Sequence, residues 1–111
     1  MKNRRLLNSA MLVTLGMGLI AATGVRAEGD AKAGSVKAIP CMGCHAIPGY
    51  SNVYPTYHVP RVGGQHADYI IAALKAYKAK ERSHRTMQAQ ASSLSEDDMK
   101  DIAAFFSSKP E

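Results

Sequence analysis

The chain has 111 residues, room for one domain, and its 14 basic and 9 acidic side chains give a formal net charge of +5. Residues 1–27 hold four of the basic residues and no acid, so residues 28–111 carry 10 basic and 9 acidic side chains, a net charge of +1. This near balance gives no support to a function in binding nucleic acid or anionic membranes.

The first 27 residues have the pattern of an export signal. Residues 10–22 are apolar, and Val25-Arg26-Ala27 places small residues at the two positions that define a cleavage site. The apolar run is shorter than the roughly 20 residues of a membrane span. We therefore expect cleavage after Ala27 and export to a bacterial periplasm, with an uncleaved anchor as the alternative. The positive start of the signal consists of Lys2, Arg4 and Arg5.

A first helix is predicted from Asp30, which can act as its cap, to about Ala38. Gly34 lies in the middle of this helix, where glycine costs about 1 kcal/mol relative to alanine. We expect that another element packs closely on that face, the alternative being a loose, poorly formed helix. Pro40 is expected to end the segment.

Cys41-Met42-Gly43-Cys44-His45 is a C-x-x-C-H motif, the pattern of covalent haem attachment. The two sulfurs add across the two vinyl groups on one edge of a haem and form thioethers. One helical turn then brings the imidazole of His45 under the macrocycle, where it can bind the iron. The motif therefore predicts one haem c per chain.

Two other interpretations of the motif remain open at this point. A disulfide or a thioredoxin-like redox pair would want a βαβ context, and no strand pattern lies nearby. A structural zinc site usually takes a second pair of ligands further along the chain, and there is no further cysteine. A haem would also supply apolar interior to a mature chain of 84 residues that has no tryptophan and only two phenylalanines.

Residues 46–64 are rich in proline and glycine and are predicted to form a loop. A loop of this length is uncommon in a small domain unless it encloses something, and a haem is a suitable object. Three tyrosines in the loop either pack on the haem ring or bond to a propionate, or they simply cover the loop. They are Tyr50, Tyr54 and Tyr57.

A second helix is predicted over residues 65–80, because its apolar side chains recur at helical spacing. Its lysines lie off this stripe and form either a solvated face or a docking patch for a redox partner. The stripe consists of Tyr69, Ile70, Ala73, Leu74 and Tyr77, and the lysines are Lys75, Lys78 and Lys80.

Met87 follows a polar stretch, residues 81–86, and is expected in a loop between helices. A methionine sulfur on the upper side of a haem would raise its reduction potential and close the site. Packing in the core is the alternative role, since methionine is a flexible apolar side chain. Met99 fits the core role better, because it lies on a helical apolar stripe.

The last helix begins after Ser95, a typical N-cap, with Asp98 three residues on as a capping-box partner. Acidic residues in its first turn complement the positive end of the helix dipole. Its apolar face consists of Met99, Ile102, Ala103 and Phe106. No strand is needed anywhere, so the sequence predicts a single all-α domain over residues 28–111.

In the order of these motifs the chain resembles the class I c-type cytochromes, in particular small bacterial cytochromes and either half of the two-haem cytochrome c-four proteins. The resemblance covers about residues 29–108. It rests on Gly29-Asp30-Ala31, Gly34, Cys41-Met42-Gly43-Cys44-His45, Gly64-Gln65-His66-Ala67-Asp68-Tyr69, Leu74, Tyr77, Arg82, Met87, Ala91, Leu94-Ser95 and Ile102-Ala103-Ala104-Phe105-Phe106.

The resemblance implies that the first and last helices cross, with Gly34 against Phe105 or Phe106. It implies thioethers from Cys41 and Cys44. It implies His45 as the lower iron ligand and Met87 as the upper one. The implied activity is outer-sphere transfer of one electron, which makes the protein a carrier that works with redox partners and not an enzyme by itself.

The chain departs from the family pattern at several positions. Lys80 stands where glycine is common, Arg85 where proline is common, and the loop over residues 49–64 is longer than usual, with Pro60-Arg61-Val62-Gly63 replacing a leucine-alanine-glycine run. His58 lies in that loop and is an alternative sixth ligand. His66 and His84 are expected at the surface.

Two functions use the same iron chemistry. The chain is either a free electron shuttle or the haem subunit of a dehydrogenase that oxidises a sulfur compound or an alcohol. A third interpretation, ligand binding or peroxidase activity at an open iron, requires that Met87 does not bind the iron.

Overall fold

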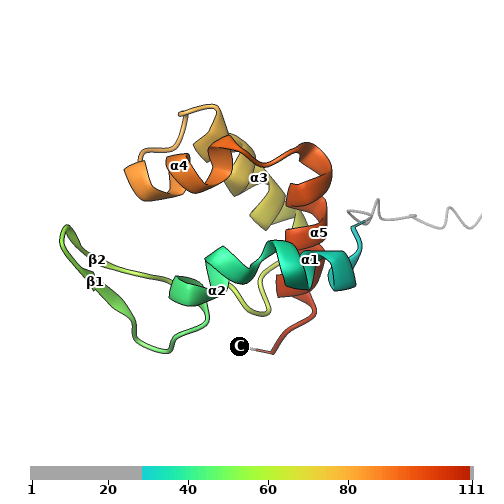
Figure 1. Cartoon of the computed structure of the whole chain (residues 1–111), viewed down its shortest axis with the longest axis horizontal. Helices are drawn as coiled ribbons and strands as arrows, with labels where there is room; N and C mark the ends of the chain where they lie inside the picture. Colours follow the sequence, from blue (N-terminus) through green and yellow to red (C-terminus); the bar gives the residue numbers. More distant parts are fainter. Residues whose placement is uncertain (1–28, 111) are drawn as a thin grey trace, which may run out of the picture.

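The computed structural model describes residues 29–110, so the predicted signal over residues 1–27 lies outside the described residues. This part of the chain is mostly helical, which confirms the predicted fold class, with one short hairpin in addition (Figure 1). The elements are α1 (Ala31–Lys37), α2 (Ile39–His45), β1 (Ser51–Val53), β2 (Thr56–His58), α3 (Ala67–Lys78), α4 (Arg85–Ser92) and α5 (Glu96–Ser107).

Helix α1 packs on α5 at Gly34, as the glycine in mid-helix predicted. A Cβ atom at Gly34 would lie 1.9 Å from the carbonyl oxygen of Asp101 and 2.9 Å from the Cβ of Phe105. Asp30 caps α1 as expected, because its side chain accepts from the backbone N–H groups of Lys32 and Ala33. The alternative of a loose first helix is therefore wrong.

An ion-pair network closes the same contact between α1 and α5. The Lys37 ammonium lies 2.7 Å from a carboxylate oxygen of Asp98 and 2.6 Å from one of Asp101. The second carboxylate oxygen of Asp101 accepts from the backbone N–H of Asp30. The hydrogen bond from Lys37 lowers the pKa of both aspartates, and the two aspartates in turn raise the pKa of Lys37.

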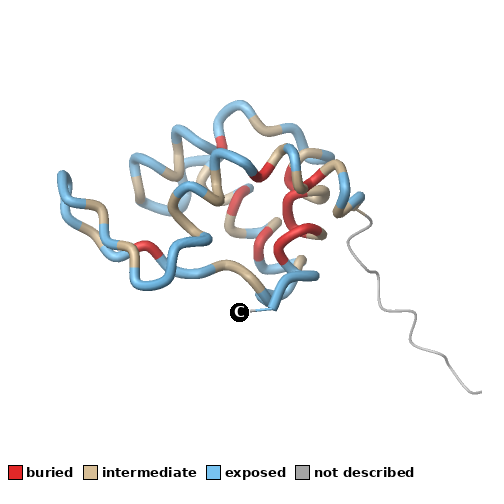
Figure 2. The backbone as a smooth tube through the Cα atoms, turned by 60° about the horizontal axis from the view of Figure 1, so that its bottom comes forward, coloured by how far each residue is buried: buried red, intermediate tan, exposed pale blue. Residues whose placement is uncertain are grey.

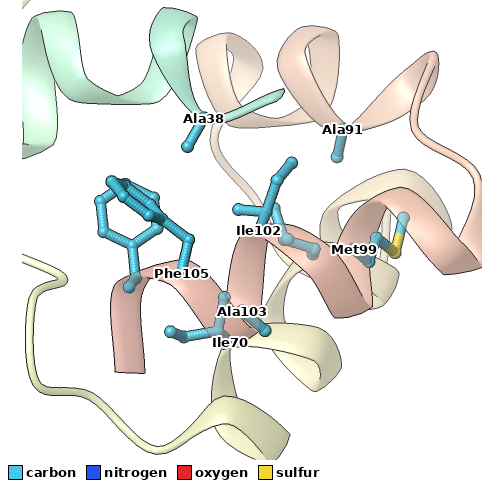
Figure 3. Packing of buried hydrophobic residues seen from close by; sticks show 9 residues of the cluster. Ala38, Ile70, Ala91, Met99, Ile102, Ala103 and Phe105 are labelled. Carbon is cyan, nitrogen blue, oxygen red and sulfur yellow. The ribbon is translucent and has the colours of Figure 1, made fainter. Parts of the chain in front are cut away.

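The hydrophobic core lies between α5 and the elements around it, and its side chains come mainly from α5 (Figure 3). Met99 and Ile102 are the largest fully buried side chains, so the expected core role of Met99 is confirmed. Buried residues gather in this helical body, whereas the hairpin is largely exposed (Figure 2). The capping box of α5 between Ser95 and Asp98 forms as predicted.

Strands β1 and β2 form an antiparallel hairpin where a loop without strands was expected. Ser51 pairs with His58 and Val53 with Thr56. Side chains close the turn, because the Thr56 hydroxyl donates to the carbonyl of Val53 at 2.7 Å. Strands of three residues are too short to show the alternation that identifies a strand in a sequence. The hairpin projects from the helical body on the side of α2 and α4 (Figure 1).

Helix α3 begins and ends slightly inside its predicted range of residues 65–80. It ends in a Schellman motif, in which the N–H of Glu81 donates to the carbonyl of Ala76 and the N–H of Lys80 to that of Tyr77. This motif requires a left-handed residue, and Lys80 has φ +62°. The departure from glycine noted at Lys80 therefore falls at a position that favours glycine.

Helix α4 corrects the expectation that Met87 lies in a loop. Met87 is the third residue of this eight-residue helix. The helix was missed because its N-cap is His84, which is not among the residue types that commonly cap helices. None of the helices within residues 29–110 has the length and apolar character that crossing a membrane requires.

Candidate functional site

A cavity of about 440 Å³ lies among α2, the segment after the hairpin, α3, α4 and α5. Protein interiors normally contain few voids larger than a water molecule, so a space of this size indicates a bound group. Most of its wall is apolar. The aliphatic and phenylalanine side chains that line it are Val59, Val62, Ile70, Ala73, Leu74, Ile102 and Phe106.

Helix α2 brings the C-x-x-C-H motif to the cavity. Cys44 and His45 lie three and four residues after Cys41, so the three side chains share one face of the helix. All three line the cavity. Pro40 lies in the first turn of α2 and therefore belongs to the start of this helix. Backbone N–H groups in the first turn have no partner within the helix, so proline loses no hydrogen bond there.

The two thiols do not have the environment of a redox pair or of a zinc site. They are free, and burial raises the pKa of Cys41, which keeps this thiol protonated near neutral pH. Reactive Cys-x-x-Cys pairs have lowered thiol pKa values. Within residues 29–110, no group of three or more His, Cys, Asp or Glu side chains is placed to hold a metal ion.

The imidazole of His45 is oriented by the segment that follows the hairpin. Its Nδ1 lies 2.6 Å from the carbonyl oxygen of Pro60. A carbonyl only accepts, so Nδ1 carries the proton and donates it in this hydrogen bond. In the neutral imidazole Nε2 then carries a lone pair that can bind a metal.

Met87 lies on α4, which is drawn above α2 in Figure 1. The side chain of Met87 lines the cavity and also packs against the hydrophobic core. The structure thus brings the four predicted site residues, Cys41, Cys44, His45 and Met87, to one cavity.

The structure places the remaining histidines differently from one another. His58 lines the cavity from β2 but is exposed, and His66 is exposed as expected. His84 was expected at the surface, which is wrong: it is half-buried, lines the cavity and caps α4. Its position follows from edge-on packing against Tyr57, with ring centroids 4.7 Å apart. The polar residues around it in the sequence gave no sign of that partner.

The three loop tyrosines also have different positions. Tyr57 lines the cavity, and its hydroxyl donates to Oγ1 of Thr86 at 3.2 Å. Tyr54 is 95% exposed at the tip of the hairpin. Tyr50 is half-buried at the base of the hairpin. Only the position of Tyr57 therefore suits a role at the bound group.

The residues of the cavity fit a haem. Two thiols, an imidazole and a thioether are groups of the kinds that attach a haem and bind its iron, and the apolar wall suits the macrocycle. Cationic and polar groups that suit carboxylates also line the cavity, and they include Arg61, Gln65 and Arg82. Arg82 is held by the hydroxyl of Tyr69 at 3.3 Å and by the ring of Tyr77 at 4.8 Å.

Comparison with known proteins agrees with this fit. Residues 31–109 match the cytochrome c family model. The chain is 35% identical over 100 residues to cytochrome c4 of Pseudomonas aeruginosa, covering 90% of this chain and 46% of that protein. It is 34% identical over 110 residues to cytochrome c4 of Stutzerimonas stutzeri, covering 90% and 49%.

A third relative is shorter and is covered almost completely. Cytochrome c-554(548) of Halomonas halodenitrificans is 38% identical over 84 residues, which cover 73% of this chain and 98% of that protein. The chain therefore spans about half the length of the cytochrome c4 relatives and nearly all of this one. It belongs to the cytochrome c family, which implies a covalently bound haem c.

Proposed function

We propose that the chain is a periplasmic one-electron carrier. Its haem is joined by thioethers to Cys41 and Cys44, with His45 and Met87 as axial ligands. The observation that carries this proposal is the hydrogen bond from His45 Nδ1 to Pro60, because it leaves Nε2 free at the cavity that Met87 lines from α4. When bound, the haem iron supplies a one-electron couple between the ferric and ferrous states.

The position of Met87 favours it over His58 as the sixth ligand. Met87 packs against the core and lies in a helix, so its backbone is held in place. His58 is exposed on a three-residue strand of a projecting hairpin. A ligand that must stay in place through both oxidation states is better supplied by the more rigid element.

The protein contributes orientation and exclusion of water. The Pro60 carbonyl fixes the tautomer of His45 and makes the imidazole a better electron donor to iron. The apolar wall keeps water from the iron, and a dry site with a thioether ligand raises the reduction potential. Arg61 and Arg82 line the cavity and would compensate the negative charge of haem propionates near them.

Export to the periplasm rests on the signal pattern of residues 1–27, which include a positive start and an apolar run. The net charge of +1 on residues 28–111 does not indicate which proteins are the electron donor and acceptor. Mass spectrometry of the exported holoprotein tests this part. A mass that corresponds to residues 28–111 plus one haem supports it, and a retained N-terminus contradicts it.

The hairpin favours a second candidate function, that of a haem subunit in a dehydrogenase complex. Val53 is 82% exposed and Tyr54 is 95% exposed, and the hairpin projects from the helical body (Figure 1). Its strand β2 carries Tyr57 and His58, which line the cavity. Exposed apolar side chains of this kind suit a lasting protein contact. Co-purification of a second chain with the wild type, lost in Tyr54→Ser, would support this candidate over the free carrier.

The visible spectrum of the holoprotein tests the ligation. The ferric wild type should show a weak red charge-transfer band from sulfur coordination, and Met87→Ala should lack it. His58→Ala is the matched control and should keep the band. A band that is absent from the wild type, together with free binding of carbon monoxide to the reduced protein, would contradict methionine ligation.

A further inference from the structure

We propose that His84 is a positioning residue for Met87, and that its imidazole Nδ1 holds the start of α4 in place on the cavity wall. This inference rests on the proposed function, because it takes Met87 as the upper iron ligand. His84 itself is not assigned to the iron. Its contacts define a role that acts through the backbone of Met87.

The first contact is the helix cap. His84 has extended backbone dihedrals, φ −174° and ψ 107°, and its Nδ1 accepts from the backbone N–H of Met87 at 3.3 Å. The first N–H groups of a helix have no partner within the helix, so a side chain that accepts from one of them fixes where the helix begins. Here the N–H that is capped belongs to the proposed ligand itself.

The cap also fixes the tautomer of His84. A nitrogen that accepts a hydrogen bond carries no proton, so the proton of the neutral ring lies on Nε2. In this state His84 offers no free lone pair to the iron, although it lines the cavity. The same histidine therefore cannot cap α4 and replace Met87 as a ligand.

Two tyrosine rings hold the imidazole in place. Tyr57 lies edge-on with centroids 4.7 Å apart and an interplanar angle of 82°, and Tyr77 lies at 6.5 Å and 72°. Tyr57 comes from β2 and Tyr77 from α3, so the cap is fixed to two elements that line the cavity. The His84 side chain therefore links the backbone of Met87 to the cavity wall.

Neighbouring hydrogen bonds reinforce the same turn. The Tyr57 hydroxyl donates to Thr86 at 3.2 Å, and the Gln88 side-chain amide donates to the carbonyl of Arg82 at 2.9 Å. They act on the residues before and after Met87, whereas His84 acts on Met87 itself. Loss of the His84 cap should therefore loosen the sulfur at the iron while most of α4 remains folded.

Competition with imidazole at the ferric iron of the holoprotein measures this effect. Added imidazole displaces the methionine sulfur, and loss of the red charge-transfer band reports its apparent Kd. His84→Ala should bind imidazole about fivefold more tightly, the change in an equilibrium constant that losing one helix cap produces. His84→Asn restores an oxygen acceptor of a preferred cap type and should stay within about twofold of the wild type.

Ser95→Ala supplies the matched control. Ser95 caps α5, which carries no proposed ligand, so its loss should lower the unfolding midpoint without changing the Kd for imidazole. The inference is overturned if His84→Ala matches the wild type, if His84→Asn behaves like His84→Ala, or if Ser95→Ala shifts the Kd equally. A wild type without the band would overturn methionine ligation first, and the inference with it.

Discussion

The contact between α1 and α5 and the wall of the haem cavity are built in different ways. At Gly34 two helix backbones meet with no room for a Cβ atom, and Lys37 adds ion pairs to two aspartates. At the cavity, side chains from several elements surround a space of about 440 Å³. The first region is complete within the chain, whereas the second needs the haem to be complete.

Removal of the haem should have the largest effect. Without the haem, the apolar wall of the cavity would face water and lose its packing partner, and small domains are only marginally stable. The double variant Cys41→Ala, Cys44→Ala, which cannot attach haem, should therefore be largely unfolded by far-ultraviolet circular dichroism. A native-like spectrum would show that the contact between α1 and α5 sustains the fold alone.

Gly34→Ala should have the next largest effect. Its Cβ would lie 1.9 Å from a backbone carbonyl, so the two helices must move apart, at a cost of about 3 kcal/mol in unfolding free energy. Gly43→Ala is the control, because no atom lies within 4 Å of a Cβ there, and it should gain about 0.5–1 kcal/mol. Urea unfolding of both holoproteins measures the difference, and equal stabilities would contradict the close contact.

The ion pairs of Lys37 predict a dependence of stability on acid pH. Asp98 and Asp101 have pKa values lowered by Lys37, so their stabilising contribution is present above the ordinary aspartate pKa of 3.8 and is lost as the pH falls below it. The urea concentration at the unfolding midpoint should therefore decrease once the pH is below about 4. In Lys37→Met this acid-dependent loss should be smaller, and an unchanged acid profile would contradict the role of Lys37.

Lys80→Gly should have the smallest effect, and it should stabilise. Lys80 has φ +62° at the end of α3, a conformation that disfavours residues with a side chain. Glycine there should raise the unfolding free energy by up to about 1 kcal/mol. Lys78→Gly, within the helix, should lower it by about 1 kcal/mol. If Lys80→Gly is also destabilising, the left-handed conformation carries no strain.

Local signals in the sequence predicted the two regions unequally. Cys41 to His45, Gly34 and the Ser95 capping box are recognisable from residue types at fixed spacing, and the structure has α1, α2 and α5 where these signals lie. The hairpin was not predicted, because three-residue strands show no periodicity. The start of α4 was not predicted either, because the cap is a histidine held by tyrosines that are distant in the sequence.

The side chains of the cavity wall were therefore the harder part to predict. Apolar residues of α3 and α5 were recognised from their helical spacing, and they line the cavity together with the motif. The roles of Tyr57, Pro60 and His84 depend on contacts between separate elements, which no short stretch of sequence encodes.

The proton NMR spectrum of the ferrous holoprotein tests the central claim most directly. The ring current of the haem should shift the methyl resonance of a bound methionine far upfield of all other methyl signals. If Met87 and His45 are the axial ligands, the wild type shows one such resonance and Met87→Leu lacks it. A wild type without the shifted methyl, or a Met87→Leu variant that keeps it, would contradict the ligation on which this account of the cavity depends.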